Sequence, residues 1–569
     1  MINNSSRKDQ WAAVTNHVQR MNGHDFLASA CVIVHSVKLI GSGQDENNQG
    51  GIMDRRDFVK TVGALSLAAA AAELSAAAER TFDPTEQSIA SLQRALASGA
   101  VTSESLTAAY LERIARFDHH GPEYRSVLSL NPDALAAART LDAERRAKKL
   151  RGPLHGLPII VKDNIETGDA VATTAGSFAL ARSRRTADAP LVGRLRAAGA
   201  IVLGKANLSE WANFRSTRST SGWSGVGGQA RNAYARDRNP SGSSAGSAVA
   251  AAASFCAAAI GTETNGSILS PSSLNGLVGL KPTIGLVSGR GVVPISPRQD
   301  TAGPMCRTVA DAAVLAAVIA ERTLGFGAHG TDLEAFRLRG VRIGAMPVPK
   351  SAHPDTARLF ADARAALAQE GAVIVDLDEP QAFAEMDEPE GDALQFEFKA
   401  AINSYLATLD PSQVECKTLA DLIAFNREHA DAELIVFGQE IFEQSEARGP
   451  LTDPAYQKAL ATLQRSADTE GLAALFAQQG VEVLLAPSNG PAERIDEVWG
   501  DRHGGGWAQI ASAAAIAGYP SLTVPAGLAG GLPVGITLVG RRNQDGLLLQ
   551  VARAYERAAD ARVPPHLVI

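Results

Sequence analysis

The sequence is poor in the residues on which metal centres and disulfide scaffolds depend. Its four cysteines, at positions 31, 256, 306 and 416, lie far apart and form no CxxC pair. The eleven histidines are also dispersed, and none belongs to an HExxH motif. We therefore expect no metal site, and we disfavour a metal-dependent hydrolase. Cys256 and Cys306 lie in apolar stretches, where buried free thiols are expected in place of disulfides.

Aromatic residues and concentrated positive charge are also scarce. Aromatic residues make up 5% of the chain, its formal net charge is −7, and it has no long basic run. This balance predicts no nucleic-acid partner. Hydrophobic residues reach 45% of 569 positions, which is enough for a large core. A single large α/β domain can have this length.

The first 78 residues contain no pattern that predicts a folded domain. Residues 53–60 (MDRRDFVK) precede an apolar run at 61–72 and the small residues SAAA at 75–78. This order predicts a twin-arginine export signal at 53–78, cleaved near Ala78. Because such a signal begins a protein, we expect translation to start at Met53. Residues 1–52 would then be upstream sequence or a disordered extension.

The alternative interpretation of this leader is an amphipathic, alanine-rich helix. The apolar run is too short and too rich in alanine for a membrane span. We therefore expect a periplasmic or secreted protein without stable membrane association after cleavage. The scarcity of cysteine pairs suits a protein that folds in a reducing compartment before export.

Beyond the leader, short apolar runs alternate with helical periodicity. We expect a pair of helices within 85–117, and further helices at 132–150, 190–198, 355–369 and 544–558. Strands are expected at 126–130, 157–161, 201–203, 257–260, 341–345, 372–377, 481–486, 521–524 and 534–539. The alternation predicts an α/β/α domain around one sheet, spanning 79–569. Residues 380–480 are almost wholly helical and predict a peripheral insertion that walls or covers a cleft.

The stretch 239–283 is the most informative part of the chain. A turn at 240–244 (PSGSS) precedes an alanine-rich helix, for which Ser243 or Ser244 could be the N-cap. A short strand then leads into the loop GTETNGS at 261–267. Gly266 permits conformations closed to other residues, and successive amides in such a loop can form an anion-binding nest. Taken alone, the loop could also be an ordinary Gly/Ser-rich surface loop.

Four sequence blocks resemble the amidase signature family. They are the lysine block GPLHGLPIIVKD at 152–163, the turn GSSAGS at 242–247, the loop at 261–267 and GLKPT at 279–283. The resemblance covers roughly residues 82–566. It is strongest toward bacterial peptide amidases because of NLSEWANF at 207–214, SGWS at 221–224 and QDTAGPM at 299–305.

The resemblance implies an amidase-signature α/β/α sandwich around a large, mixed, twisted sheet. It also implies a serine–lysine mechanism, with Ser267 as nucleophile, Ser243 as bridging serine and Lys162 as base. In the family the bridging serine follows a cis peptide bond, so we expect Gly242–Ser243 to be cis. Backbone amides would form the oxyanion hole, and we expect no cofactor; those amides belong to Thr264, Asn265, Gly266 and Ser267.

Without the matching block, Lys162 would be read as a solvated lysine at the end of a strand. Ser244 is expected to hydrogen-bond near the site, although it could simply cap the helix. Three residues depart from the family pattern: Ala245 and Glu263 replace glycine and aspartate, and Asn265 stands where many members have glycine. The Asn265 side chain could face the leaving-group region and alter substrate choice. Candidates for the substrate wall, which could equally be core aromatics, are Trp211, Phe214 and Trp223.

The predicted function is an exported amidase that releases ammonia from C-terminal peptide amides through an acyl-enzyme on Ser267. Its partner would be a small-molecule or short-peptide amide. A nearby alternative is a broad acylamidase or aryl-amide hydrolase, because pocket shape determines substrate class. The amidotransferase members of the family resemble the chain less and work with cytoplasmic partners and tRNA. A catalytically silent binding protein is a further alternative, and the oligomeric state is left open.

Overall fold

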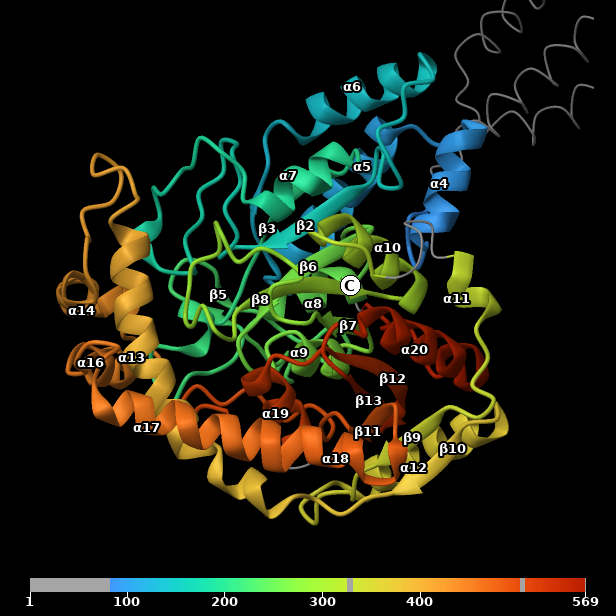
Figure 1. The fold of residues 1–569 in the computed structure, drawn as a ribbon. Helices are drawn as coiled ribbons and strands as arrows, with labels where there is room; N and C mark the ends of the chain where they lie inside the picture. Colours follow the sequence, from blue (N-terminus) through green and yellow to red (C-terminus); the bar gives the residue numbers. More distant parts are fainter. Residues whose placement is uncertain (1–81, 325–330, 502–506, 568–569) are drawn as a thin grey trace, which may run out of the picture. The chain divides into compact units, whose positions relative to one another are not determined.

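The chain divides into two units, Met1–Thr81 and Phe82–Ile569. A computed structural model describes residues 82–324, 331–501 and 507–567 (Figure 1). The predicted extension at 1–52 and the predicted signal at 53–78 lie outside the described residues.

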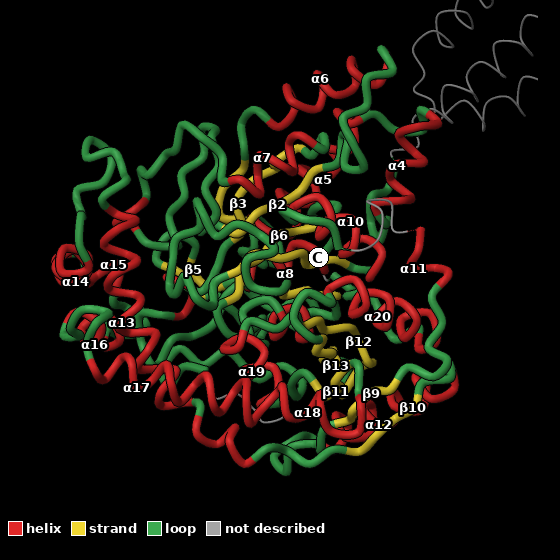
Figure 2. The backbone as a smooth tube through the Cα atoms, in the orientation of Figure 1, coloured by secondary structure: helices red, strands yellow, loops and turns green. Residues whose placement is uncertain are grey.

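An eleven-stranded sheet organises this unit (Figures 1 and 2). In spatial order its strands are β1 (Val127–Leu130), β3 (Ile201–Ala206), β2 (Pro158–Lys162), β6 (Ala258–Glu263), β8 (Thr301–Cys306), β7 (Val278–Lys281), β12 (Ser521–Ala529), β13 (Leu532–Gly540), β11 (Val483–Pro487), β9 (Arg342–Ala345) and β10 (Val373–Asp376). Parallel and antiparallel neighbours alternate in blocks, so the sheet is mixed. A separate two-stranded sheet joins β4 (Trp223–Ser224) and β5 (Gly228–Gln229).

Helices surround this sheet, and most of them pack directly on its strands and bury its apolar side chains. They are α4 (Ile89–Ser98), α5 (Ser103–Arg113), α6 (Ala134–Arg146), α7 (Pro190–Ala197), α8 (Ala245–Ala252), α9 (Leu269–Leu274), α10 (Val309–Ile319), α11 (Thr331–Ala335), α12 (Pro354–Gln369), α19 (Gln509–Ala517) and α20 (Asp545–Ala559). Every residue of α8 is buried, as its alanine-rich sequence allows. The predicted α/β arrangement around a mixed sheet is confirmed. Cys256 and Cys306 are buried free thiols, as expected.

The segment between β10 and β11 is helical throughout its regular structure, in agreement with the helical character predicted for 380–480. Figure 1 shows its helices along the left and lower border of the view. They are α13 (Asp387–Leu406), α14 (Leu419–Glu428), α15 (Ala430–Glu433), α16 (Glu440–Glu446), α17 (Pro454–Leu463) and α18 (Ala473–Ala477), with shorter helical turns at Gln381–Glu385, Gln464–Leu472 and Gln478–Gly480. Within the described ranges, no helix combines the length and apolar character needed to cross a membrane.

Two parallel strands at the centre of the sheet bring distant residues to one edge. Val161 of β2 pairs with Ile260 of β6. Because parallel strands end at the same edge, the residues that follow these two positions lie side by side. Lys162 is therefore placed beside the last residues of β6, which include the first three positions of the predicted loop 261–267.

Candidate active site

Lys162 lies at this edge of the sheet with no exposed surface. Its Nζ donates hydrogen bonds to Ser243 Oγ at 2.7 Å and to Thr262 Oγ1 at 2.9 Å. Burial lowers the pKa of Lys162 to about 7, against the opposing attraction of Asp300 and Glu263. A lysine in this state has an accessible neutral form near neutral pH, which a proton acceptor needs.

The turn before α8 holds the Ser243 hydroxyl against the lysine. The Gly242–Ser243 peptide bond is cis, as expected. A Cβ atom at Gly242 would lie 2.2 Å from Ser209 Oγ, so only glycine fits there. Ser209 N also donates to the Ser243 carbonyl oxygen at 3.0 Å. The hydroxyl of Ser243 is thus fixed by its backbone as well as by Lys162.

Ser244 occupies the N-cap position of α8, yet its side chain makes no capping hydrogen bond. Its hydroxyl donates to the Thr262 carbonyl oxygen at 2.9 Å and accepts from Thr262 N at 3.1 Å. The expected hydrogen-bonding role therefore describes Ser244 better than helix capping does. Through Thr262, this residue joins the serine turn to the strand that leads into the loop.

The loop after β6 presents backbone amides beside Ser267. Gly266 has a φ of +82°, in the left-handed region that favours glycine. A Cβ atom there would also lie 3.1 Å from the Trp507 indole. The amides of Asn265, Gly266 and Ser267 donate no hydrogen bond to any residue that the structure describes. These three donors are available to an anion.

Three carboxylate side chains accept hydrogen bonds from this loop and from the residues that follow it. Glu263 Oε2 accepts hydrogen bonds from the amides of residues 268 and 269, at 2.7 and 3.0 Å. Thr264 Oγ1 donates to Asp300 Oδ1 at 2.6 Å. Burial raises the pKa of Asp300 to about 6. The Asn265 side chain donates to Glu390 of α13, and Asn265 also lines the cavity described below, so the leaving-group orientation considered for it stays a prediction.

Ser267 lies on the wall of a cavity of about 680 Å³. The serine turn and the loop form one side of this cavity, and Leu394 of α13 lies on its wall as well. Three carboxylates line it, those of Asp387, Glu493 and Asp501. Its described lining residues include no lysine, arginine or histidine. The described part of the chain also holds no cluster of three side chains suited to a metal ion.

Comparison with known proteins fits this geometry. Residues 105–549 match the Amidase family. The chain belongs to that family. A solved peptide amidase from Stenotrophomonas maltophilia shares 47% identity, with a TM-score of 0.79, over 85% of this chain and 99% of that chain. A protein of Arabidopsis thaliana named "Probable amidase" is 39% identical over 86% of this chain and 93% of that protein. A solved amidase family protein from Bacillus anthracis is 33% identical, with a TM-score of 0.74, over 85% of this chain and 93% of that chain.

Only one of the three aromatic residues predicted for the substrate wall of this amidase lines the cavity. Phe214 does so, and its ring packs edge-on against Phe398 of α13. Trp211 and Trp223 are only 3% and 4% exposed and lie outside the cavity lining, so their prediction as wall residues is wrong. Their indoles pack instead on phenylalanines of the insertion, 442 and 437.

Sequence reasoning missed the aromatic residue that does stand beside the loop, Trp507. This residue lines the cavity against Gly266, and its indole Nε1 donates to Ser512 Oγ of α19 at 2.9 Å. It is 240 positions from Ser267 and lies in no recognised motif. Nothing in its local sequence distinguishes it from a core tryptophan.

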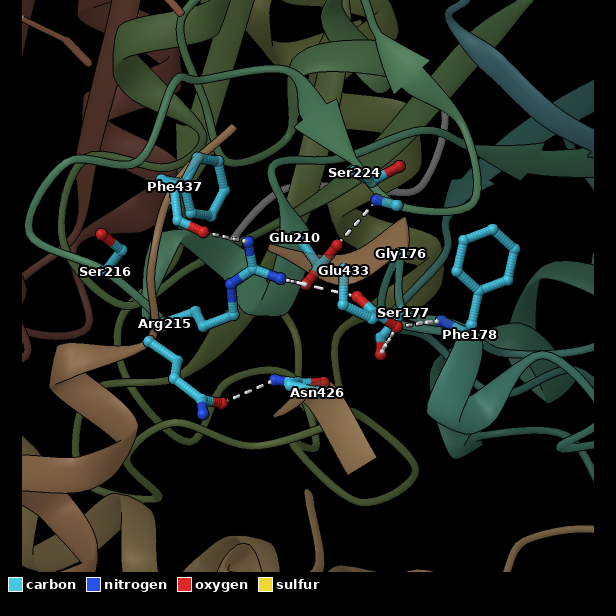
Figure 3. A network of polar contacts seen from close by, with 12 residues as sticks. Gly176, Ser177, Phe178, Glu210, Arg215, Ser216, Ser224, Asn426, Glu433 and Phe437 are labelled. Atoms are coloured by element: carbon cyan, nitrogen blue, oxygen red, sulfur yellow. Dashed lines mark hydrogen bonds and ion pairs between the residues drawn. The ribbon is translucent and has the colours of Figure 1, made fainter. Parts of the chain in front are cut away.

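A buried ionic network fixes the amidase insertion to this wall (Figure 3). The fully buried Arg215 pairs with Glu210 and Glu433, and its Nη2 donates to the Phe437 carbonyl oxygen at 3.2 Å. Glu433 also accepts hydrogen bonds from Ser177 Oγ and the following amide, both at 2.8 Å. Burial raises the pKa of Glu210 despite the nearby guanidinium. The network ties α15 to the chain segment that carries Phe214.

Proposed function

We propose that this amide hydrolase releases ammonia from C-terminal peptide amides through an acyl-enzyme on Ser267. The observation that carries the proposal is the buried Lys162, hydrogen-bonded to Ser243, with the next amide of the same turn, that of Ser244, donating to the carbonyl oxygen of the cavity-lining Ser267 at 3.3 Å. The likeness to a solved peptide amidase at 47% identity supports the substrate class.

In the proposed mechanism, neutral Lys162 accepts the Ser243 proton while Ser243 accepts the proton of Ser267. Ser267 Oγ then bonds to the amide carbonyl carbon, and the C–N bond breaks. The relay returns the proton to the departing ammonia. Water, activated by the same relay, attacks the ester and releases the carboxylic acid. All the groups required belong to the chain and the substrate.

Negative charge develops on the substrate carbonyl oxygen in both steps. The free amides of Asn265, Gly266 and Ser267 are the donors proposed for it, with Thr264 at the start of the loop. Fixed donors of this kind are often the largest contribution to acyl-transfer catalysis. Because they are already unpaired, they lose no internal hydrogen bond when the oxyanion forms.

The charge of the cavity favours a neutral carboxamide over a carboxylate. Asp387, Glu493 and Asp501 would attract the α-ammonium group of a short peptide and repel a newly formed carboxylate product. A volume of about 680 Å³ lies in the range of small-ligand sites. These features support short peptide amides as substrates and predict prompt release of the acid.

The first test is a comparison of substrates for the purified protein. C-terminally amidated dipeptides are expected to release ammonia faster than anilides or long-chain fatty amides. Internal peptide bonds of the corresponding free-acid peptides should stay intact. Ammonia and amine release are measured separately by enzymatic assay and chromatography. Hydrolysis of anilides or fatty amides alone would contradict the peptide-amide proposal and favour a broad acylamidase.

We also propose that residues 53–78 direct export through the twin-arginine pathway. Changing Arg55 and Arg56 to lysine together should retain the full chain in the cytoplasm as an uncleaved precursor. Arg80→Lys, outside the proposed signal, should leave export unchanged. Fractionation of bacterial cells followed by mass determination of the amino terminus measures both. Periplasmic accumulation of the double variant would contradict the proposal.

A further inference from the structure

Glu390 is a carboxylate of the helical insertion that reaches the loop beside Ser267. It lies in the first turns of α13 and is only 8% exposed. Asn265 Nδ2 donates to both of its oxygens, at 3.0 and 2.9 Å. Gln299 Nε2 donates to Glu390 Oε1 at 2.7 Å and also lies 3.3 Å from the Thr264 carbonyl oxygen. Glu390 thus accepts hydrogen bonds from two side-chain amides, those of Asn265 and Gln299.

The other carboxylates that hold this loop act at its two ends. Asp300 holds Thr264, and Glu263 holds the backbone after Ser267. The middle of the loop, where the free amides lie, is bonded through the Asn265 side chain to Glu390. Trp507 packs against Gly266 but donates its only side-chain N–H elsewhere. Among the described residues, Glu390 is therefore the side-chain anchor of the middle of the loop, beside the Ser270 amide, which donates to the Gly266 carbonyl oxygen at 2.8 Å.

We propose that Glu390 is a positioning residue that aims the Asn265 and Gly266 amides at the substrate oxygen. This inference rests on the proposed function, because it assigns the loop amides to the oxyanion. It makes the insertion part of the catalytic apparatus as well as a wall of the cavity. Preorganised donors stabilise a transition state only when their directions are fixed before charge develops.

The surroundings of Glu390 are consistent with a carboxylate kept for its hydrogen bonds. Burial raises the pKa of Glu390 to about 7, and the repulsion of Asp387 acts in the same direction. The hydrogen bonds from Gln299 and Asn265, and the positive charge of Arg298, oppose that rise. An acid without a role in the protein would be replaced at little loss by a neutral side chain, because burying its charge is unfavourable.

The test uses steady-state kinetics on an amidated dipeptide and on an anilide. Glu390→Ala is expected to lower kcat on the order of 10- to 100-fold through a misplaced loop, with KM nearly unchanged. Glu390→Gln keeps an acceptor of the same shape and should recover part of the loss. Glu388→Ala, an exposed position on the same helix, is the matched control and should retain the kcat of the unmodified protein.

A double-mutant cycle separates positioning from general loss of stability. If Glu390 acts through Asn265, the double variant with both changed to alanine should be no slower than the slower single variant. Effects on kcat that simply multiply would overturn the inference. Unchanged kcat in both Glu390 variants would also overturn it. Should Glu390→Ala fail to fold, the isosteric Glu390→Gln decides the question by the same kcat and KM criteria.

Failure of this inference is distinguishable from failure of the proposed function. Ser267→Ala is assayed beside the Glu390 variants on the same two substrates. Full activity of Ser267→Ala would contradict the proposed function itself. An inactive Ser267→Ala together with fully active Glu390 variants would remove only the role given to Glu390.

Discussion

Replacing Ser267 with alanine is expected to lower kcat by about 10⁶-fold, the loss found when a serine protease loses its nucleophile. No other hydroxyl is proposed to attack the carbonyl carbon, and the Ser243 hydroxyl is hydrogen-bonded to Lys162 Nζ. The free loop amides would still bind the substrate carbonyl. KM should therefore change little while turnover disappears.

Acid quenching during turnover of the unmodified protein should trap the acyl group, and peptide mass mapping should locate it on Ser267. The matched control is Ser272→Ala in the adjoining helix α9. Ser272 is fully buried and its hydroxyl has no hydrogen-bond partner among the described residues, so its removal should leave kcat intact. An adduct on Ser243, or turnover by Ser267→Ala near that of the unmodified protein, would contradict the assignment.

Much of the fold follows from local sequence. The apolar run ending at Lys162 is β2, and the run predicted as a strand at 257–260 is the first half of β6. Both strands are buried on every residue, so an apolar run predicts where they lie. The second half of β6, Gly261–Glu263, was predicted as loop, because glycine, threonine and glutamate give no apolar signal. Their parallel pairing then brings Lys162 to Thr262. The convergence of the lysine with the serine turn is thus largely a consequence of two central strands.

Strand β8 was not predicted, although it lies inside the sheet, between β6 and β7 in spatial order. Strand β8 contains Gly303 and Pro304, which are poor signals for a central strand. The structure supplies the reason for the glycine. A Cβ atom at Gly303 would lie 2.0 Å from the carbonyl oxygen of Leu280 in the neighbouring chain segment. The close approach of the two backbones requires glycine at position 303. Because glycine and proline interrupt the apolar pattern, the sequence gives no sign of this strand.

The side chains around the cavity were predicted less well than the strands. Trp211 and Trp223 belong to two sequence blocks that resemble peptide amidases, yet both side chains pack on the insertion. Glu390 lies 125 positions from Asn265 in sequence, and Trp507 lies 240 positions from Ser267. The first contact depends on how the insertion packs on the sheet, and the second on the path of the chain between β11 and α19. No local pattern of charge or hydrophobicity encodes that packing.

Lys162→Met is expected to lower kcat on the order of 10⁴-fold, because methionine cannot accept the serine proton. For the unmodified protein, kcat/KM should rise with pH through a midpoint near pH 7 and should level off above it. The pKa of Lys162 is lowered to about 7 by burial, so the neutral base is depleted as pH falls below that value. A rate that continues to rise tenfold per pH unit up to about pH 10 would contradict a perturbed lysine.

The same substitution is expected to stabilise the fold in acid. Between pH 7 and about 10.4 the unfolded chain binds a proton at Lys162 that the folded chain does not, so stability rises with pH in this window. Below pH 7 the folded protein carries the full penalty of a buried ammonium, and methionine removes it. The gain in Tm of Lys162→Met, followed by circular dichroism, should therefore be larger at pH 6 than at pH 9.

Lys205 provides the contrasting case within the same sheet. It is equally buried, but its Nζ lies 3.5 Å from Asp163 Oδ1, whereas Lys162 forms no ion pair with any described residue. Lys205→Met would leave Asp163 buried without its counterion and should lower stability, by about 3–5 kcal/mol for a pair of this kind. A lower Tm for Lys162→Met at pH 6 would contradict the view that this lysine is kept for its chemistry at the expense of stability.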